Sequence, residues 1–576
     1  MRLQRYLPCL QWLSGYGRQT LTSDLVAALI VTLMLIPQSL AYALLAGLPT
    51  EMGLYASMLP LVLYAVFGTS RTLSVGPVAI TALMTAAALE PLAPVSSPEY
   101  VAGAVLLTVM SGLMLLAMGV LRLGFLANFL SHPVISGFIS ASGLLIAASQ
   151  LRHLLGIDLD GHNLWSLMVG AAGELGQIHG LTMMVGLGTV AFLLGGRRWG
   201  RSLLAGLGMT SAWADPLSKA TPIVAVVVTA LLAWGLSLDQ QGVAVVGAVP
   251  AGLPELVMPT LDWSRWQALA VAALLISVVG FVETVSVGQT LAAKRRQQID
   301  PDQELLGLGA ANLGAGLSGG MPVTGGFSRS VVNFEAGAVT PAAGVFAALG
   351  MGMATLWLTP AIAYLPKATL AATIIVAVMG LIDLPALVRT WRYSKVDFAA
   401  MLATILLTLG YSVEAGIIAG VGLSVASFLY RTSRPHVALV GRVPGTEHFR
   451  NTLRHQVEVS DQVALLRVDE GLYFANARFL EETVLGLVSQ QPNLTDLVLV
   501  CPAVNQIDAS ALDSLEVINE RLAAADVRFH LSEVKGPVMD RLARTRFLRR
   551  LTGRVFLSTY EAWQTLVSAA NEPTGP

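Results

Sequence analysis

The sequence predicts a helical, multi-pass membrane protein followed by a small α/β domain. Hydrophobic residues make up 54% of the 576 residues and charged residues only 12%, whereas soluble domains carry about 25% charged residues. Apolar stretches long enough for membrane helices recur from Leu25 to Leu429. After Arg431 the sequence becomes polar and arginine-rich, and predicted strands alternate with predicted helices.

Fourteen membrane spans are predicted from the apolar stretches. Two of them, at 77–89 and 326–338, are short. A helix of about thirteen residues rises only about 20 Å, whereas the hydrocarbon core is about 30 Å thick. The predicted spans are 24–45, 53–68, 77–89, 100–121, 133–152, 181–195, 221–238, 266–290, 304–318, 326–338, 341–359, 366–385, 397–411 and 413–431.

Basic residues predict the orientation of the spans. The loops at 156–180 and 239–264 contain no Lys or Arg, and basic clusters fall at the other ends of the spans. We therefore expect an inner-membrane protein with the N-terminus, the basic clusters and the C-terminal domain in the cytoplasm. The clusters are Arg122, Arg197-Arg198-Arg201, Lys294-Arg295-Arg296 and Arg389-Arg392-Lys395.

The two short spans occupy matching positions, because each is third in a set of seven. Leu73-Ser-Val-Gly-Pro77 precedes the first, and Pro322-Val-Thr-Gly-Gly326 precedes the second. Seven spans in each half require the halves to be inverted repeats. Short, Gly- or Pro-interrupted spans at matching positions are typical of transporter binding sites. The alternative is that Gly and Pro are simply common in membrane helices, and the glycines of 307–320 are expected to allow tight helix packing.

A lone arginine, Arg329, follows the Gly-Gly pair of the second short span. A charge at membrane depth is a candidate functional site, and a helix N-terminus favours an anion. Pro77 is expected in the first turn of the first short helix, which leaves the N–H groups of Val78 and Ala79 free. The alternative is that Arg329 neutralises an acid such as Glu283 or Glu335.

Three further polar residues in the apolar spans are candidate site residues. Gln38 and Tyr42 lie four residues apart, so they share one helix face, and both offer hydrogen-bond donors. The alternative is that Gln38 pairs with backbone loosened by Pro37 and that Tyr42 merely packs. Glu283 is a lone carboxyl in 274–291; such groups serve as proton relays in transporters, and Na⁺ is the alternative ligand.

The C-terminal segment is predicted to form one compact α/β domain. Strands are expected at 463–468, 496–500 and 527–532, and helices at 478–488 and 509–523. The chain is thus divided into an N-terminal segment (1–23), a transmembrane domain (24–431), a linker (432–454), the α/β domain (455–567) and a tail (568–576). The two cysteines lack metal-ligand spacing, and Cys501 is expected in the core.

The sequence resembles the sulfate permease (SulP) family of anion transporters with a C-terminal STAS domain. The matching motifs recur in order over nearly the whole chain. They are Ile36-Pro-Gln-Ser-Leu-Ala-Tyr-Ala43, Ala46-Gly-Leu-Pro49, Gly53-Leu-Tyr-Ala-Ser57, Ser74-Val-Gly-Pro77, Gly280-Phe-Val-Glu283, Asp302-Gln-Glu-Leu-Leu-Gly-Leu-Gly-Ala-Ala-Asn312, Phe327-Ser-Arg-Ser-Val-Val-Asn333 and Val498-Leu-Val-Cys-Pro-Ala-Val-Asn-Gln-Ile-Asp508.

The resemblance implies a 7+7 fold with core and gate domains, a homodimer and an elevator-type motion. Glutamate at 283 is similar to the proton-coupled sulfate members, and Val287 one turn later cannot ligate Na⁺, although Ser286 lies close. The STAS loop reads Asp508-Ala509-Ser510, without the serine that directly follows the aspartate in phosphorylated relatives. The substrate-binding residues that we predict are Gln38, Tyr42, Gly76, Pro77, Val78, Ala79, Phe327, Ser328 and Arg329, with Glu283 as the proton-coupling residue.

The predicted function is proton-coupled symport of sulfate or a related inorganic anion. Sodium-coupled bicarbonate symport, passive anion exchange or conduction, and dicarboxylate transport remain as alternatives. We expect no enzymatic activity, because no nucleophile–base pair or metal-ligand cluster is present in the sequence. No cofactor is expected beyond the coupling proton, and no nucleic acid partner; the STAS domain is expected to serve assembly, trafficking or regulation.

Overall fold

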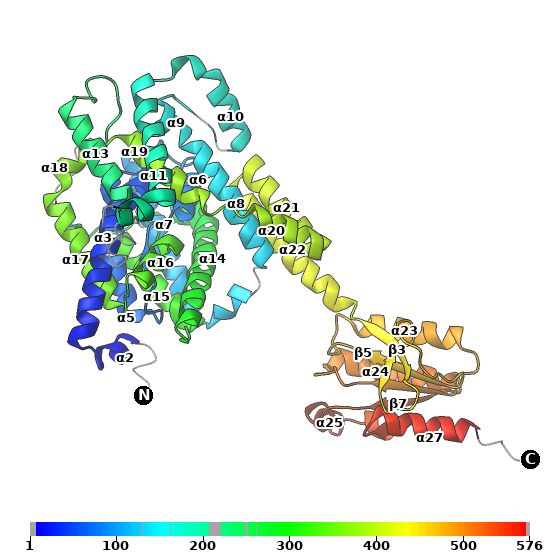
Figure 1. Cartoon of the computed structure of the whole chain (residues 1–576). Coiled ribbons are helices and arrows are strands. Elements are labelled where there is room, and N and C mark those ends of the chain that lie inside the picture. Colours follow the sequence, from blue (N-terminus) through cyan, green and yellow to red (C-terminus); the bar gives the residue numbers. More distant parts are fainter. Residues whose placement is uncertain are drawn as a thin grey trace, which may run out of the picture. The chain divides into compact units, whose positions relative to one another are not determined.

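The computed structural model of the chain describes residues 7–128, 131–159, 161, 163–206, 221–247, 252–260 and 262–571. It divides into two compact units, Met1–Ser424 and Val425–Pro576, which are coloured in sequence order in Figure 1. The first unit is helical. The second unit contains a six-stranded β-sheet with helices packed on it.

Every one of the fourteen predicted spans contains a helix of the first unit. Eight helices in the described part of the chain are long and apolar enough to cross a membrane, and several shorter apolar helices accompany them. The helices are α2 (Cys9–Leu13), α3 (Arg18–Leu45), α4 (Thr50–Tyr55), α5 (Leu59–Phe67), α6 (Ala79–Leu89), α7 (Pro98–Val120), η1 (Leu123–Asn128), α8 (His132–Ser149), α9 (Leu151–Leu155), α10 (Leu164–Gly173), η2 (Leu175–Gln177), α11 (Gly180–Gly206), α13 (Thr221–Gly235), α14 (Trp263–Lys294), α15 (Pro301–Leu317), α16 (Phe327–Glu335), α17 (Ala342–Trp357), α18 (Thr359–Ile362), α19 (Lys367–Met379), α20 (Leu384–Tyr393), α21 (Lys395–Gly410) and α22 (Val413–Ser433).

Helices α7, α14 and α15 pack against one another in the bundle of Figure 1. The contact between α7 and α15 is close because glycines face each other. A Cβ atom on Gly112 would lie 3.0 Å from the carbonyl oxygen of Gly309, and one on Gly309 would lie 3.0 Å from that of Gly112. The expected role of the glycine-rich stretch in tight helix packing is therefore confirmed.

Two ten-residue helices of the first unit were not among the predicted spans. α10 lies within the loop predicted at 156–180, and α20 follows α19, where one span was predicted over 366–385. Both are too short to give a membrane-span signal. α10 is apolar, whereas α20 mixes apolar and basic residues.

The second unit contains a six-stranded sheet of order β4-β3-β5-β6-β7-β8. The strands from β5 to β8 are parallel, whereas β3 pairs antiparallel with both β4 and β5. The elements are β3 (Val437–Arg442), β4 (Phe449–Asn451), β5 (Val463–Val468), α23 (Ala477–Gln490), β6 (Asp496–Val500), α24 (Ala509–Ala524), β7 (Arg528–Ser532), α25 (Gly536–Leu542), α26 (Phe547–Arg550), β8 (Val555–Phe556) and α27 (Thr559–Asn571).

The predicted strands and helices of this unit match β5, β6, β7, α23 and α24. The range predicted as a linker, 432–454, instead contains β3 and β4, so the sheet begins at Val437. The predicted tail, 568–576, begins within α27, and residues 572–576 lie outside the described residues. Cys501 is buried at the end of β6, and burial raises the pKa of its thiol to about 12, as expected of a core residue.

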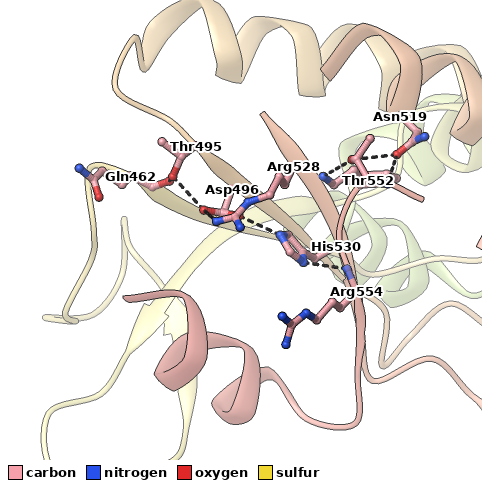
Figure 2. A network of polar contacts seen from close by, with 9 residues as sticks. Gln462, Thr495, Asp496, Asn519, Arg528, His530, Thr552 and Arg554 are labelled. Carbon is pink, nitrogen blue, oxygen red and sulfur yellow. Dashed lines mark hydrogen bonds and ion pairs between the residues drawn. The ribbon is translucent and has the colours of Figure 1, made fainter. Parts of the chain in front are cut away.

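Asp496 is the centre of a buried polar network in this sheet (Figure 2). It accepts hydrogen bonds from Thr495 Oγ1 at 2.8 Å and Arg528 Nη2 at 2.8 Å. Because Nδ1 of His530 accepts from the Arg554 N–H at 3.0 Å, the imidazole proton lies on Nε2, which donates to Asp496 at 2.9 Å. Burial alone would raise the pKa of Asp496, but these hydrogen bonds outweigh it and lower the pKa to about 2.

Asp496→Asn is expected to lower the free energy of unfolding of the second unit by about 1–3 kcal/mol at neutral pH. A carboxylate whose folded pKa is depressed stabilises the fold above its ordinary pKa, and this contribution is lost as the pH falls toward 2. Hydrogen exchange of the full chain should show faster exchange in β6 and β7. Asp513→Asn, an exposed control on α24, should leave these strands unchanged; equal effects of the two substitutions would contradict the assignment.

Candidate functional site

The two short helices begin at the same place in the bundle, on either side of a two-stranded antiparallel pairing. β1 (Val75–Gly76) precedes α6, and β2 (Thr324–Gly325) precedes α16. Val75 pairs with Gly325 and Gly76 with Thr324, and the Gly326 N–H donates to the Ser74 carbonyl at 3.2 Å. The N-termini of α6 and α16 therefore meet, as the matching short spans predicted. Each helix N-terminus carries about half a positive charge.

Side chains of α14 and α15 hold β2 in place. Thr284 Oγ1 accepts from the Gly325 N–H at 3.0 Å and contacts Thr324 Oγ1 at 2.8 Å. The amide of Asn312 bonds to both backbone groups of Val323, at 2.9 and 3.0 Å. These groups satisfy backbone that has left the helix, which is required wherever irregular backbone lies at membrane depth.

The side chains of α16 reach back to the segment before α6. Ser330 Oγ accepts from the Ser74 N–H at 3.0 Å, and Asn333 Nδ2 donates to the Thr72 carbonyl at 2.9 Å. Neither side chain was singled out from the sequence. The only signal for either was a polar residue in an apolar span, which also marks ordinary contacts between membrane helices.

Two buried carboxylates fix the loops that flank the short helices. Glu304, at the start of α15, accepts from the N–H groups of Thr69 and Ser70 at 2.7 and 3.0 Å and from Tyr64 Oη at 2.7 Å. Asp24 on α3 accepts from the N–H groups of Val339 and Thr340 at 2.7 and 3.1 Å. Neither carboxylate was predicted from the sequence as part of the site's support.

Arg329 lies in the first turn of α16 and is only 2% exposed. Its Nη1 donates to the Pro77 carbonyl at 2.7 Å. Its other two nitrogens, Nε and Nη2, are buried and have no hydrogen-bond partner among the described residues. Cβ atoms on Gly76 and Gly326 would approach Nη2 to 3.3 and 2.9 Å, so the two glycines leave room for the guanidinium.

The predicted position of Pro77 in the first turn of a helix is wrong. α6 begins at Ala79, and its N-cap residue, Val78, is still extended, with φ −132° and ψ 159°. The physical reason is that β1 continues the β pairing and the chain stays extended beyond it. Pro77 contributes its carbonyl to Arg329, while Val78 and Ala79 are buried at the start of α6.

The other predicted substrate-binding residues lie on α3 and at the start of α16. Tyr42 on α3 is buried and interacts electrostatically with Arg329 and Glu283. Gln38, one turn before it, is half-buried, and its side chain has no hydrogen-bond partner among the described residues. Phe327 and Ser328, in the first turn of α16, are exposed.

Glu283 faces a cavity of about 30 Å³, which has room for a water molecule. Its Oε2 is buried without a hydrogen-bond partner in the described chain. Glu283 and Arg329 interact electrostatically, but within the described chain they do not form an ion pair with each other. Val287 is buried and Ser286 is exposed. The cavity is otherwise lined by Ile80, Val134, Ile135, Phe138, Ile139, Val279, Val282 and Ile417.

No cluster of three or more metal-ligating side chains occurs among the residues that the structure describes. What the site offers is a set of donors: two buried guanidinium nitrogens, two helix N-termini and the buried hydroxyl of Tyr42. Broken helices whose N-termini meet within a membrane bundle define a secondary transporter fold.

Comparisons with known proteins agree with this class. The model of the sulfate permease family matches residues 21–404, and that of the STAS domain matches residues 454–562. The chain is 33% identical to probable sulfate transporter 4.2 of Arabidopsis thaliana, with 98% of this chain and 84% of that protein covered. It is also 33% identical to a probable sulfate transporter of Mycobacterium tuberculosis, with 93% of each covered.

Solved structures show the same fold. The murine Solute Carrier 26 family member A9 anion transporter, in its inward-facing state, matches with a TM-score of 0.88 at 24% identity, over 98% of this chain and 94% of that one. The transmembrane domain of the cyanobacterial bicarbonate transporter BicA matches with a TM-score of 0.60 at 24% identity, over 71% of this chain and 99% of that one. The chain belongs to the sulfate permease family and is a multi-pass membrane protein with a C-terminal STAS domain.

Gly326→Ala is expected to reduce transport about tenfold or more while leaving the fold intact. The added Cβ would lie 2.9 Å from Arg329 Nη2 and 3.1 Å from Val78 Cγ1, so the guanidinium has to move. The φ of Gly326, −76°, suits alanine. The measurement is the initial rate of anion uptake into proteoliposomes.

Gly188→Ala on α11 is the matched control, because a Cβ there would meet nothing within 4 Å. Its uptake rate should equal that of the unchanged protein. Normal uptake by Gly326→Ala would show that the position of the guanidinium does not matter.

Proposed function

We propose that the protein is a secondary active transporter that carries sulfate, or a related inorganic anion, together with protons. The observation that supports this most strongly is Arg329: a buried guanidinium, bonded to the Pro77 carbonyl and left with two unpartnered nitrogens at the junction of two helix N-termini. Those nitrogens form the edge that binds a tetrahedral oxyanion in a bidentate way. The names of the sulfate transporters that resemble the chain support the same substrate class.

The charge of the site favours a divalent anion when Glu283 is neutral. Arg329 supplies one positive charge and the two helix ends about half a charge each, for a sum of about two. A sulfate ion would balance this sum, whereas an ionised Glu283 would leave a net negative charge inside the protein. Sulfate and a proton on Glu283 would therefore stabilise each other, which is the condition for symport.

The surroundings of Glu283 favour a proton over a sodium ion. Hard cations are held by several oxygen ligands, but the cavity beside Glu283 is otherwise lined by apolar side chains. Ser286, the nearby hydroxyl considered as a second ligand, is exposed and does not line this cavity. A carboxyl in such a place is more readily neutralised than paired with a cation.

The same cavity suggests how protonation would control an elevator-type movement. Glu283 on α14 faces apolar residues of α8 and α22, which include Phe138 and Ile417. Sliding a charged carboxylate along an apolar wall is unfavourable, whereas a protonated carboxyl passes more easily. We propose that α6, α14 and α16 move together with the anion, past α8 and α22, once Glu283 is protonated.

The remaining expectations belong to the same proposal. They are an inner-membrane location with the N-terminus and the STAS domain in the cytoplasm, a homodimer, and a regulatory or assembly role for the STAS domain. In that domain Asp508 caps α24 by accepting from the Ala511 N–H at 2.8 Å. Ala509 follows it, where phosphorylated relatives carry serine, so regulation by phosphorylation at that position is not proposed.

Glu283→Gln should uncouple uptake from the proton gradient. Glutamine is permanently neutral, so we expect sulfate uptake driven by its own gradient to continue while the stimulation by an inward proton gradient disappears. The measurement is radiolabelled sulfate uptake with and without imposed proton and sodium gradients, with bicarbonate and a dicarboxylate tested in parallel.

Glu414→Gln is the control variant, because it removes a glutamate carboxyl at the start of α22, outside the proposed site. Sulfate uptake by this variant should still be stimulated by an inward proton gradient. Stimulation by sodium instead of protons, or uptake of bicarbonate but not sulfate, would overturn the proposed coupling and substrate. Uptake that ignores both gradients in the unchanged protein would indicate passive exchange.

Arg329→Lys is expected to reduce sulfate uptake about tenfold or more and to raise KM, because lysine keeps the charge but lacks the planar fork. Arg197→Lys is the matched control, since Arg197 also donates to a backbone carbonyl, that of Val376, at 2.9 Å. Equal KM values for the two variants would contradict a direct contact between Arg329 and the anion.

A further inference from the structure

Helix α20 connects α19 to α21 and is not used by the proposed transport site. Its ten residues span about 15 Å, too little to cross a membrane. Because it joins two apolar helices, α19 and α21, we infer that it lies where the chain turns at the membrane surface. Its N-terminus is fixed: Asp383 Oδ1 accepts from the Ala386 N–H at 3.0 Å, and the Asp383 N–H donates to Ser140 Oγ on α8 at 3.1 Å.

One face of α20 is apolar and exposed. Leu384, Val388 and Trp391 follow a spacing of four and three residues, which places them on one side of the helix. They are 66%, 51% and 50% exposed. Ala386, by contrast, is buried, so α20 rests on the bundle by one side and leaves the other side to its surroundings. Such a helix typically lies in the membrane interface.

Basic residues border this apolar face. Leu384, Pro385, Val388, Arg389 and Arg392 line a shallow, open groove along α20. Arg389 contacts Asp383 at 3.1 Å, but both side chains are largely exposed, and an ion pair of this kind contributes little. Arg392 has no ion-pair partner among the described residues. Lys395 lies one turn beyond Trp391, with its Nζ 3.1 Å from the centre of the indole ring.

We propose that this groove binds an anionic phospholipid. The acyl chains would lie on Leu384, Pro385 and Val388, and the phosphate would be bound by Arg389 and Arg392, with Lys395 adding positive charge. The groove and such a lipid are complementary in charge, because guanidinium groups bind phosphate in a bidentate way and basic groups at the membrane surface attract anionic lipids. An aromatic ring at that level anchors the helix in the interface.

The test uses the full chain in phosphatidylcholine vesicles that contain a photoactivatable phosphatidylglycerol. After irradiation, the lipid attached to the peptide that holds α20 is measured against the lipid attached to α17, whose Leu349 and Leu356 are also exposed. We expect label to be enriched on α20 and the enrichment to fall as salt is raised. A photoactivatable phosphatidylcholine should not be enriched there.

The double variant Arg389→Gln with Arg392→Gln should lower the ratio of lipid label on α20 to lipid label on α17. The expected decrease is about fivefold for each arginine removed. Arg392→Gln alone, which disturbs no ion pair of the described chain, should give about fivefold. Arg478→Gln with Arg521→Gln is the matched control, because both arginines are exposed in the second unit and the change in net charge is the same.

If each variant attaches as much lipid to α17 as the unchanged protein does, its membrane domain is folded. The proposal is overturned if phosphatidylcholine labels α20 as strongly as phosphatidylglycerol does, or if the arginine variants retain full labelling. It is also overturned if the control pair loses as much label, or if α20 is cross-linked to a second copy of the chain instead of to lipid. None of these outcomes depends on transport activity, so this test is separate from that of the proposed function.

Discussion

The antiparallel pairing of β1 with β2 is the constraint on which the rest of the membrane domain depends. Two helices that begin inside a membrane bundle leave backbone groups that hydrocarbon cannot satisfy, and each unsatisfied group costs several kcal/mol. The pairing satisfies the residues just before both helices, and Thr284, Asn312 and Ser330 satisfy their neighbours. Where the N-termini of α6 and α16 meet, two nitrogens of Arg329 stay buried without a hydrogen-bond partner in the described chain.

The position of Arg329 follows from this pairing. The hydrogen bond of its side chain to the Pro77 carbonyl joins the two halves of the junction and orients the guanidinium. The small residues Gly76 and Gly326 leave space beside it. A buried cation without an ion-pair partner is unfavourable by itself. In the proposed function an anion completes this arrangement. Glu283, which interacts electrostatically with Arg329 but forms no ion pair with it in the described chain, is proposed to exchange a proton.

The sequence predicted the helices, the two short spans and the lone charges well, because each depends on composition and spacing alone. It did not predict the role of Thr284 or Asn312, since a polar residue in an apolar span looks the same whether it binds backbone, a neighbouring helix or a substrate. The extended conformation of Val78 depends on a partner strand more than two hundred residues away, so Pro77 was placed in the helix. Likewise β3 and β4 have no clear pattern before they are paired with β5, and the short, mixed sequence of α20 hides its role.

The central claim is that the anion lies between the N-termini of α6 and α16 and contacts the free edge of Arg329. The most direct test is a crystal structure of the protein with selenate, a sulfate analogue that can be located by the anomalous scattering of selenium. We predict a selenium peak at this junction, with selenate oxygens within hydrogen-bond distance of Nε and Nη2 of Arg329. A peak elsewhere in the membrane domain, or an Arg329 paired with Glu283 while selenate is bound, would contradict the account.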